Sequence, residues 1–210
     1  MRVLVAGANG STGFRVVRKL IGGPHVPVAM IRDPDQRPRF DDHGAETVVA
    51  DLEGPLDEAV EGCDGVVFCA GSGADTSLEK TRDVDRDGAI RLVDAAEKAG
   101  VERFVMLSSM GADPDAEGGG MNVYYRCKGA ADEHLRGGEL EHVIVRPGRL
   151  TEEPGTGRID VAPELGRSGT VSRDDVAEVL VRSLALGHLA GTTFEMLRGE
   201  TPVRAALEQL

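Results

Sequence analysis

Short apolar runs alternate along the chain with longer stretches in which apolar positions recur every three or four residues. Each run predicts a buried strand, because a strand of a parallel sheet is covered on both faces. The predicted strands are residues 2–6, 26–31, 47–50, 65–69, 103–107 and 142–146. The predicted helices between them are residues 12–21, 55–60, 77–99 and 124–136. This alternation is typical of an α/β fold with a doubly wound parallel sheet, the Rossmann arrangement.

The sequence contains no repeat, low-complexity tract or long linker, which predicts one domain over residues 1–210. Residues from about 150 to 210 form a small elaboration on the substrate side in this prediction. It holds an irregular stretch at 151–169, a helix at 172–186, a strand at 193–197 and a short final helix. Two loops, 71–75 and 111–122, follow predicted strands. We expect both to be mobile and to lie at the sheet edge where ligands bind.

The first predicted strand breaks into a glycine-rich turn, Gly7-x-x-Gly10-x-x-Gly13, directly before an amphipathic run. A strand, such a turn and a helix together seat a dinucleotide pyrophosphate on the helix N-terminus. In that role Gly7 permits the tight turn, Gly10 lets the backbone approach phosphate, and Gly13 lets the helix pack on the strand. The cofactor-binding residues predicted in this turn are Gly7, Asn9, Gly10, Ser11, Thr12 and Gly13.

Tyr124 and Lys128 are four residues apart in a predicted helix, so their side chains share one face. A nearby cation favours the phenolate form of a tyrosine, whose ordinary pKa is about 10. The preceding strand ends in Ser108-Ser109, which places a hydroxyl at the carboxyl edge of the sheet. Together these residues predict proton transfer to a substrate oxygen. The Tyr-Lys spacing by itself often arises by chance, and without that context it more often indicates a half-exposed helix face.

Composition excludes several classes of function. A net charge of −12 and a pI near 4.9 argue against a nucleic-acid-binding surface. No run of about 18 apolar residues is present, so we expect no membrane span. The three cysteines lack a C-x-x-C spacing, which favours reduced thiols and a cytoplasmic protein. No metal-ligand spacing is found, and Asp83, Asp85 and Asp87 are interpreted as a solvated helix face.

Further motifs follow the predicted strands in a fixed order: Arg32-Asp33, Asp51-Leu52, Cys69-Ala70-Gly71 and Val145-Arg-Pro-Gly148. With the glycine turn and Tyr124-x-x-x-Lys128 they resemble the short-chain dehydrogenase/reductase superfamily. More specifically, the chain resembles the atypical branch with an NmrA-like NAD(P)-binding domain, and the resemblance covers nearly the whole chain.

The resemblance implies a role for each of these positions. Ser109, or its neighbour Ser108, would hold the substrate oxygen, and Tyr124 would pass the proton. Lys128 would bind the nicotinamide ribose and tune the tyrosine. The remaining cofactor-binding residues would be Pro147 and Gly148 beside the nicotinamide, Asp51 and Leu52 beside the adenine, and Cys69, Ala70 and Gly71 after the fourth strand.

Arg32 lies where a Rossmann fold selects its cofactor, and an arginine there accommodates the 2′-phosphate of NADP. We therefore predict an NADP-dependent oxidoreductase that acts on a small carbonyl or alcohol, as a monomer or small homo-oligomer. The alternatives are a non-catalytic, redox-sensing NADP-binding regulator, a nucleotide-sugar epimerase-like enzyme and a flavin reductase-like enzyme. The substrate depends on residues 71–81, 111–122 and 151–169, which carry the weakest patterns.

Overall fold

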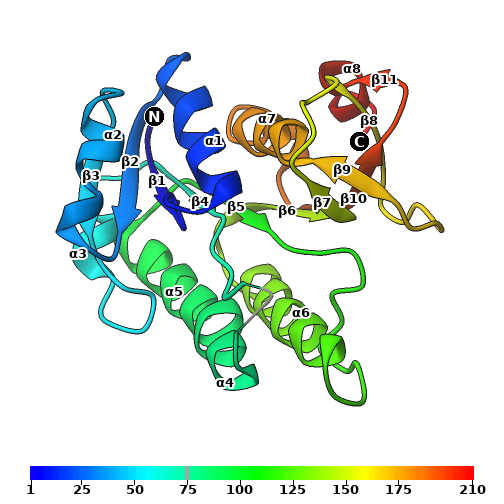
Figure 1. The fold of residues 1–210 in the computed structure, drawn as a ribbon, viewed down its shortest axis with the longest axis horizontal. Coiled ribbons are helices and arrows are strands. Elements are labelled where there is room, and N and C mark those ends of the chain that lie inside the picture. The colour runs from blue at the N-terminus through cyan, green and yellow to red at the C-terminus, as the bar shows by residue number, and fades with distance from the viewer. Residues whose placement is uncertain (74–75) are drawn as a thin grey trace.

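The structure is a computed structural model that describes residues 1–73 and 76–210. Ala74 and Asp75, in the predicted loop 71–75, lie outside the described residues. A central sheet carries helices on both faces (Figure 1). Its strand order is β11-β8-β10-β6-β5-β4-β1-β2-β3. The order reverses at β1: β2 and β3 follow on one side of β1, and β4 to β6 follow on its other side. The predicted doubly wound α/β fold is confirmed.

Seven strands of the sheet run parallel to one another. They are β1 (Arg2–Ala6), β2 (Val26–Ile31), β3 (Glu46–Val49), β4 (Gly65–Phe68), β5 (Arg103–Leu107), β6 (Glu141–Pro147) and β10 (Thr192–Arg198). All seven were predicted, with ends that differ by no more than one residue. The register places Val5 opposite Ala29 of β2 and Val67 of β4, so neighbouring strands end at a common carboxyl edge.

The helices form two layers, one on each face of the sheet (Figure 1). Helices α1 (Ser11–Ile21) and α7 (Arg173–Ser183) cover one face, where Val3 and Val5 are fully buried. Helices α5 (Ala89–Ala99) and α6 (Met121–Gly137) cover the other, where Leu4 is fully buried. The shorter helices are α2 (Pro38–Asp41), α3 (Asp57–Val60), α4 (Leu78–Thr81), α8 (Val203–Leu207) and the 3-10 turns η1 (Pro34–Gln36) and η3 (Gly187–Leu189). Burial on both faces explains the continuous apolar runs.

The helix predicted at 77–99 is interrupted. Between α4 and α5 the chain forms a π-helical segment, η2 (Arg82–Gly88). Its last residue packs closely on the loop after β3, because a Cβ at Gly88 would lie 2.8 Å from the Cβ of Leu52. Arg91 fixes the same contact by donating to the Leu52 carbonyl at 2.8 Å. Such widened turns are rare and concentrate at functional sites.

The prediction of an irregular stretch at 151–169 is wrong. This region contains β8 (Arg158–Ala162), which pairs antiparallel with β10, and β11 (Thr201–Pro202) then pairs with β8. A second, two-stranded sheet joins β7 (Arg149–Thr151) to β9 (Thr170–Ser172). Only Ile159 of β8 is fully buried, so this short edge strand lacks the apolar run that marks the central strands. Its pairing partner lies far away in the sequence.

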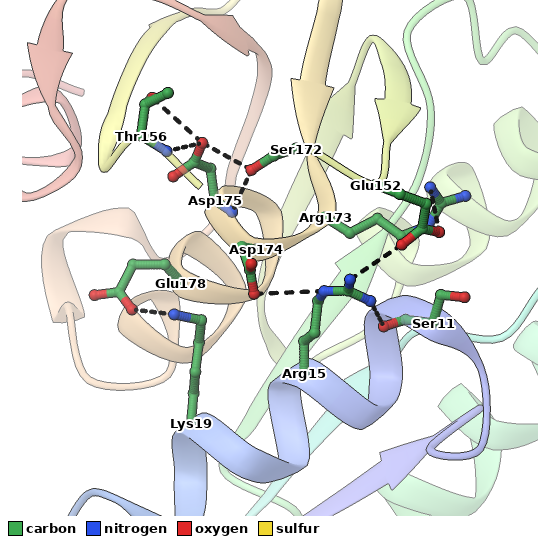
Figure 2. A network of polar contacts seen from close by, with 10 residues as sticks. All are labelled: Ser11, Arg15, Lys19, Glu152, Thr156, Ser172, Arg173, Asp174, Asp175 and Glu178. Atoms are coloured by element: carbon green, nitrogen blue, oxygen red, sulfur yellow. Dashed lines mark hydrogen bonds and ion pairs between the residues drawn. The ribbon is translucent and has the colours of Figure 1, made fainter. Parts of the chain in front are cut away.

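Charged contacts join α1 to α7 and to the segment after β7 (Figure 2). Arg15 lies 3.0 Å from Glu152 and 3.4 Å from Asp174, and Lys19 lies 3.1 Å from Glu178. Helix α1 is therefore joined to α7 and to Glu152 by ion pairs as well as by its buried apolar side chains. No described helix is both long and apolar enough to cross a bilayer.

Candidate cofactor and proton-transfer site

A cavity of about 310 Å³ opens at the carboxyl ends of β1, β2 and β4. This is the point where the strand order reverses, the usual ligand site of such sheets. The predicted residues that line it are Gly7, Asn9, Gly10, Arg32, Asp51, Leu52, Cys69, Ala70 and Gly71. The cavity is also lined by Met30, Gln36, Ala50 and Val84, which no sequence motif marked, and by Ser72 and Lys80 from the region 71–81 that was expected to contact the substrate. Four of these are apolar or small, so composition alone could not distinguish them from core residues.

The three glycines of the first turn have different surroundings. Gly7 has φ +81°, and a Cβ there would lie 2.6 Å from the backbone of Ala70. A Cβ at Gly13 would collide with the carbonyl oxygen of Gly7. At Gly10 a Cβ would approach only that same oxygen, at 3.3 Å. Gly7 and Gly13 are therefore required by packing, whereas Gly10 keeps the cavity side of the turn open.

The start of α1 suits an anion. Gly10 provides no side-chain cap, and the first turn contains no acidic residue, so backbone N–H groups are left for an external acceptor. Ser11 is exposed at this end, while Thr12 is buried. A glycine turn that is open at Gly10, an unopposed helix N-terminus and an adjoining cavity fit a bound dinucleotide.

One arginine lines the cavity, and a second contacts Asn9 in its wall. Arg32 is exposed at the end of β2, and its backbone N–H donates to Gln36 at 3.3 Å. The Arg39 guanidinium donates to the carbonyl of Asn9 at 2.8 Å and stacks 4.1 Å above the ring of Phe14. Among the described residues, neither arginine has a carboxylate within ion-pair distance. The Arg39 guanidinium is thus engaged by Asn9 and Phe14, whereas Arg32 lines the cavity.

Three polar side chains lie along one face of α6 at four-residue spacing: Tyr124, Lys128 and Asp132. The Nζ of Lys128 is 5.9 Å from the ring centre of Tyr124 and 5.2 Å from that of Phe68. Tyr124 is half-buried, as is Ser109 at the end of β5. The helix thus carries a phenol and an ammonium to the carboxyl edge of the sheet.

The two neighbouring serines have separate environments. Ser108 is buried, and its hydroxyl donates to Asp132 at 2.8 Å. The same carboxylate accepts from Arg146 at 2.9 Å and 2.8 Å. Burial raises the pKa of Asp132, although Arg146 and Ser108 oppose that effect. The Ser109 hydroxyl donates only to the carbonyl of Met110, at 3.0 Å, which leaves Ser109 as the serine able to contact a substrate.

Lys128 is enclosed by the protein, with 3% of its surface exposed. Its Nζ lies 3.3 Å from Asp85, 3.4 Å from the Ala70 carbonyl and 3.3 Å from that of Leu107. Burial lowers the pKa of Lys128, but Asp85, Tyr124 and Asp132 more than offset this, and the net shift is upward. All three N–H donors already have protein partners, so a bond to a ribose requires one of them to be exchanged. The predicted ribose contact stays a prediction.

The interpretation of Asp83, Asp85 and Asp87 as a solvated face is wrong for Asp85. Asp85 is fully buried and faces α6. The sequence carried a usable signal, because Asp85 lies seven residues before Leu92 and on the same buried face of the segment. A carboxylate on an apolar helix face is costly unless it is paired, so its presence there predicts a buried cation.

The remaining predicted positions have structural contacts. Burial raises the pKa of the Cys69 thiol to about 12, with Lys128 opposing, so the thiol is protonated at neutral pH. Pro147 accepts from the N–H of Met110 at 3.0 Å, which ties the end of β6 to the loop after β5. A Cβ at Gly148 would lie 2.5 Å from the carbonyl of Gly169. Neither Pro147 nor Gly148 lines the cavity, and their contact with nicotinamide stays a prediction.

Comparison with known proteins matches residues 7–186 to the family described as NAD(P)H-binding. The uncharacterized sugar epimerase YhfK of Bacillus subtilis is 40% identical, and the match covers all of both chains. A Bacillus halodurans structure named as an NAD-dependent epimerase/dehydratase is 42% identical over both full chains, with a TM-score of 0.96. The oxidoreductase ylbE of Lactococcus lactis is 30% identical, with coverage of 100% and 96% and a TM-score of 0.86.

These matches agree with the geometry of the site. The family match begins at Gly7, the first glycine of the turn, and extends through α7. The full-length relatives share the fold in which the cavity lies where the strand order reverses. The chain therefore belongs to the NAD(P)H-binding family, among the atypical short-chain dehydrogenase/reductase proteins.

Proposed function

We propose that the protein is an NADP-dependent oxidoreductase that interconverts a small carbonyl compound and its alcohol. The observation that carries this proposal is the placement of Tyr124 one helical turn from the buried Lys128 ammonium, whose Nζ contacts the carbonyl of the cavity-lining Ala70. A bound nicotinamide would supply or accept the hydride. The pyrophosphate would be held by the turn from Gly7 to Gly13.

The chain's own groups provide the proton chemistry in this proposal. The Ser109 hydroxyl orients the substrate oxygen, and the Tyr124 phenol donates its proton to that oxygen. The positive charge of Lys128 stabilises the resulting phenolate, because the two groups are one helical turn apart. Tyr124 is half-buried rather than enclosed, so water can return the proton after the step. A positioned general acid contributes about 10²–10⁴-fold to the rate.

We infer a preference for NADP over NAD from Arg32 and Arg39, which have no carboxylate partner among the described residues. Arg32 lines the cavity, and Arg39 stacks on Phe14 and donates to Asn9 of the glycine turn. A guanidinium fork matches the oxygens of a phosphate, whereas the ribose hydroxyl of NAD is better served by a carboxylate.

The three free thiols also fit a reducing, cytoplasmic setting.

A sugar epimerase is the second candidate, favoured by the names of the full-length relatives in Bacillus subtilis and Bacillus halodurans. Such a reaction uses the same phenol and ammonium, but the hydride returns to the substrate and no cofactor is consumed. A regulator without turnover is the third candidate, since the photosystem II assembly factor Ycf39 of Synechocystis is 34% identical over 114 residues.

One assay separates these candidates. NADPH oxidation is followed with quinones, flavins, aldehydes and ketones, using the wild type, Tyr124→Phe and the neighbouring control Tyr125→Phe. The proposal expects carbonyl-dependent oxidation that is lost only in Tyr124→Phe. Flavin reduction that survives Tyr124→Phe would indicate a flavin reductase-like enzyme. A nucleotide sugar is incubated separately with the protein and oxidised cofactor, and its inversion without net oxidation would indicate an epimerase. Tight NADPH binding without any turnover would indicate a regulator.

A further inference from the structure

The π-helical segment η2 directs one carboxylate at two functional elements. An Asp85 oxygen accepts from the backbone N–H of Ser72 at 3.0 Å, and the other lies 3.3 Å from the Nζ of Lys128. The carboxylate also packs against Gly71 of the cavity lining, where a Cβ would lie 3.3 Å from its oxygen. Asp85 therefore bridges the cavity-lining loop after β4 and the inner face of α6.

This contact decides whether Lys128 can carry a charge. An ammonium removed from water is strongly disfavoured unless an opposite charge and hydrogen bonds replace its hydration. Two of the partners of Lys128 are neutral carbonyls, those of Ala70 and Leu107. Asp85 supplies the opposite charge in direct contact, and it is itself fully buried. Without Asp85, the favourable way to bury Lys128 is as a neutral amine.

We propose that Asp85 is a positioning residue that keeps the Lys128 ammonium charged and in place beside Tyr124. The role of Tyr124 in this statement rests on the proposed function. The effect on the phenol follows from distance: Lys128 is in contact with Asp85 on one side and one helical turn from Tyr124 on the other. Asp85 would then influence proton transfer without touching the substrate.

Other titratable groups face Lys128 from each packed element. Asp132 of α6 also raises the pKa of Lys128, but it is not in contact with Nζ and is paired directly with Arg146 of β6. Cys69 at the end of β4 has a pKa of about 12, raised by burial and lowered only in part by Lys128, and is uncharged at neutral pH. Asp87 of η2 pairs with its neighbour Arg86. Asp85 is the carboxylate in contact with Nζ among the described residues.

The chain allows a test that needs neither substrate nor cofactor. It contains two tyrosines and no tryptophan, so in a Tyr125→Phe background the ultraviolet phenolate signal reports Tyr124 alone. We compare the midpoint of the phenolate titration with and without Asp85→Asn. The proposal expects Lys128 to lose its proton in the variant, which raises the midpoint by roughly half a unit or more. A midpoint that falls or does not move overturns the proposal, because Lys128 would then be charged without Asp85.

Matched variants isolate the path through Lys128. Asp83→Asn removes a carboxylate of the same segment and is expected to leave the midpoint unchanged, whereas Asp85→Glu is expected to restore it in part. In a Lys128→Met background, Asp85→Asn must no longer raise the midpoint; a rise there contradicts the proposal. If Asp85→Asn does not fold, the double variant with Lys128→Met must recover the fold, and its failure to do so equally contradicts the proposal.

The titration distinguishes this proposal from the proposed function. An absence of turnover on every substrate would remove the oxidoreductase while leaving the midpoint comparison intact. Conversely, turnover that depends on Tyr124 together with an unmoved midpoint would retain the oxidoreductase and reject Asp85 as the residue that holds Lys128 charged.

Discussion

The Nζ of Lys128 lies 5.9 Å from the ring centre of Tyr124, one turn away on α6. The ammonium is buried and the phenol is half-buried. The charge is thus enclosed by the protein, whereas the proton-bearing group is partly accessible. Two tasks were expected of Lys128, binding a ribose and favouring the phenolate form of Tyr124. The enclosed ammonium is close enough to Tyr124 for the second task whether or not it binds a ribose.

Replacing Tyr124 by phenylalanine should remove the proton donor and leave the cavity unchanged. We expect kcat to fall by about 10²–10⁴-fold while the Kd for NADPH stays within a factor of two or so of wild type. Tyr125→Phe is the control, because its ring is 5.8 Å from that of Tyr124. Steady-state kinetics and calorimetric titration measure both quantities. Equal turnover by the two variants would exclude Tyr124 as the acid.

Arg32→Ala and Arg39→Ala should each weaken NADP binding more than NAD binding. A lost charge-assisted contact to phosphate costs about 1.5–3 kcal/mol, and NAD lacks the phosphate. Arg37→Ala is the matched control from the same connection, since Arg37 donates to Thr47. Calorimetry with both cofactors gives the ratio. Equal affinity of the wild type for NADP and NAD would reject the assignment.

Substitutions in the glycine turn should separate binding from folding. Gly10→Val fills the open side of the turn, so we expect a folded protein that no longer binds NADPH. Gly13→Ala places a Cβ against the Gly7 carbonyl, so we expect a loss of about 1–3 kcal/mol in unfolding free energy. Circular dichroism with thermal melts and NADPH titration test both. Retained NADPH affinity in Gly10→Val would make this glycine dispensable for the cofactor.

The sequence predicted the parallel core because each central strand is apolar on both faces. Val3 and Leu4 are buried against different helical layers, and that two-sided burial is what a continuous apolar run encodes. The glycine turn was equally readable from its spacing, although only Gly13 meets a neighbour within the turn and Gly7 packs against the distant Ala70. The edge strand β8 was not, because its partner β10 is distant in sequence and only Ile159 is fully buried.

Long-range contacts also limited the prediction of the site. Arg39 reaches Asn9 across 30 residues, and Lys80 reaches Glu53 across 27, so neither pairing has a local pattern. Asp85 was misread because a run of alternating aspartates in a helix usually faces solvent. The π-helical segment and the buried Lys128 reverse that expectation, and the choice between Ser108 and Ser109 needed the contact with Asp132.

The contacts between α1 and α7 in Figure 2 predict a pH dependence of stability. Burial raises the pKa of Glu178, but the ion pairs with Lys19 and Arg182 lower it by more, so the net shift of the pKa is downward. A carboxyl whose pKa is lower in the folded than in the unfolded protein stabilises the fold at any pH above its unfolded pKa. This stabilisation is lost as the pH falls through the folded pKa. Glu178→Gln should cost about 0.5–1 kcal/mol at neutral pH and almost nothing in acid. Urea unfolding across pH measures this. A cost that persists unchanged in acid would exclude the ionic contribution.

The most direct test of the oxidoreductase uses NADPH that carries deuterium at C4 of the nicotinamide. The wild type is incubated with each carbonyl of the panel, and the alcohol is analysed by mass spectrometry. The account predicts deuterium on the former carbonyl carbon, in an amount that matches the NADPH oxidised, and almost none with Tyr124→Phe. NADPH that binds tightly while no product ever carries deuterium would contradict the account.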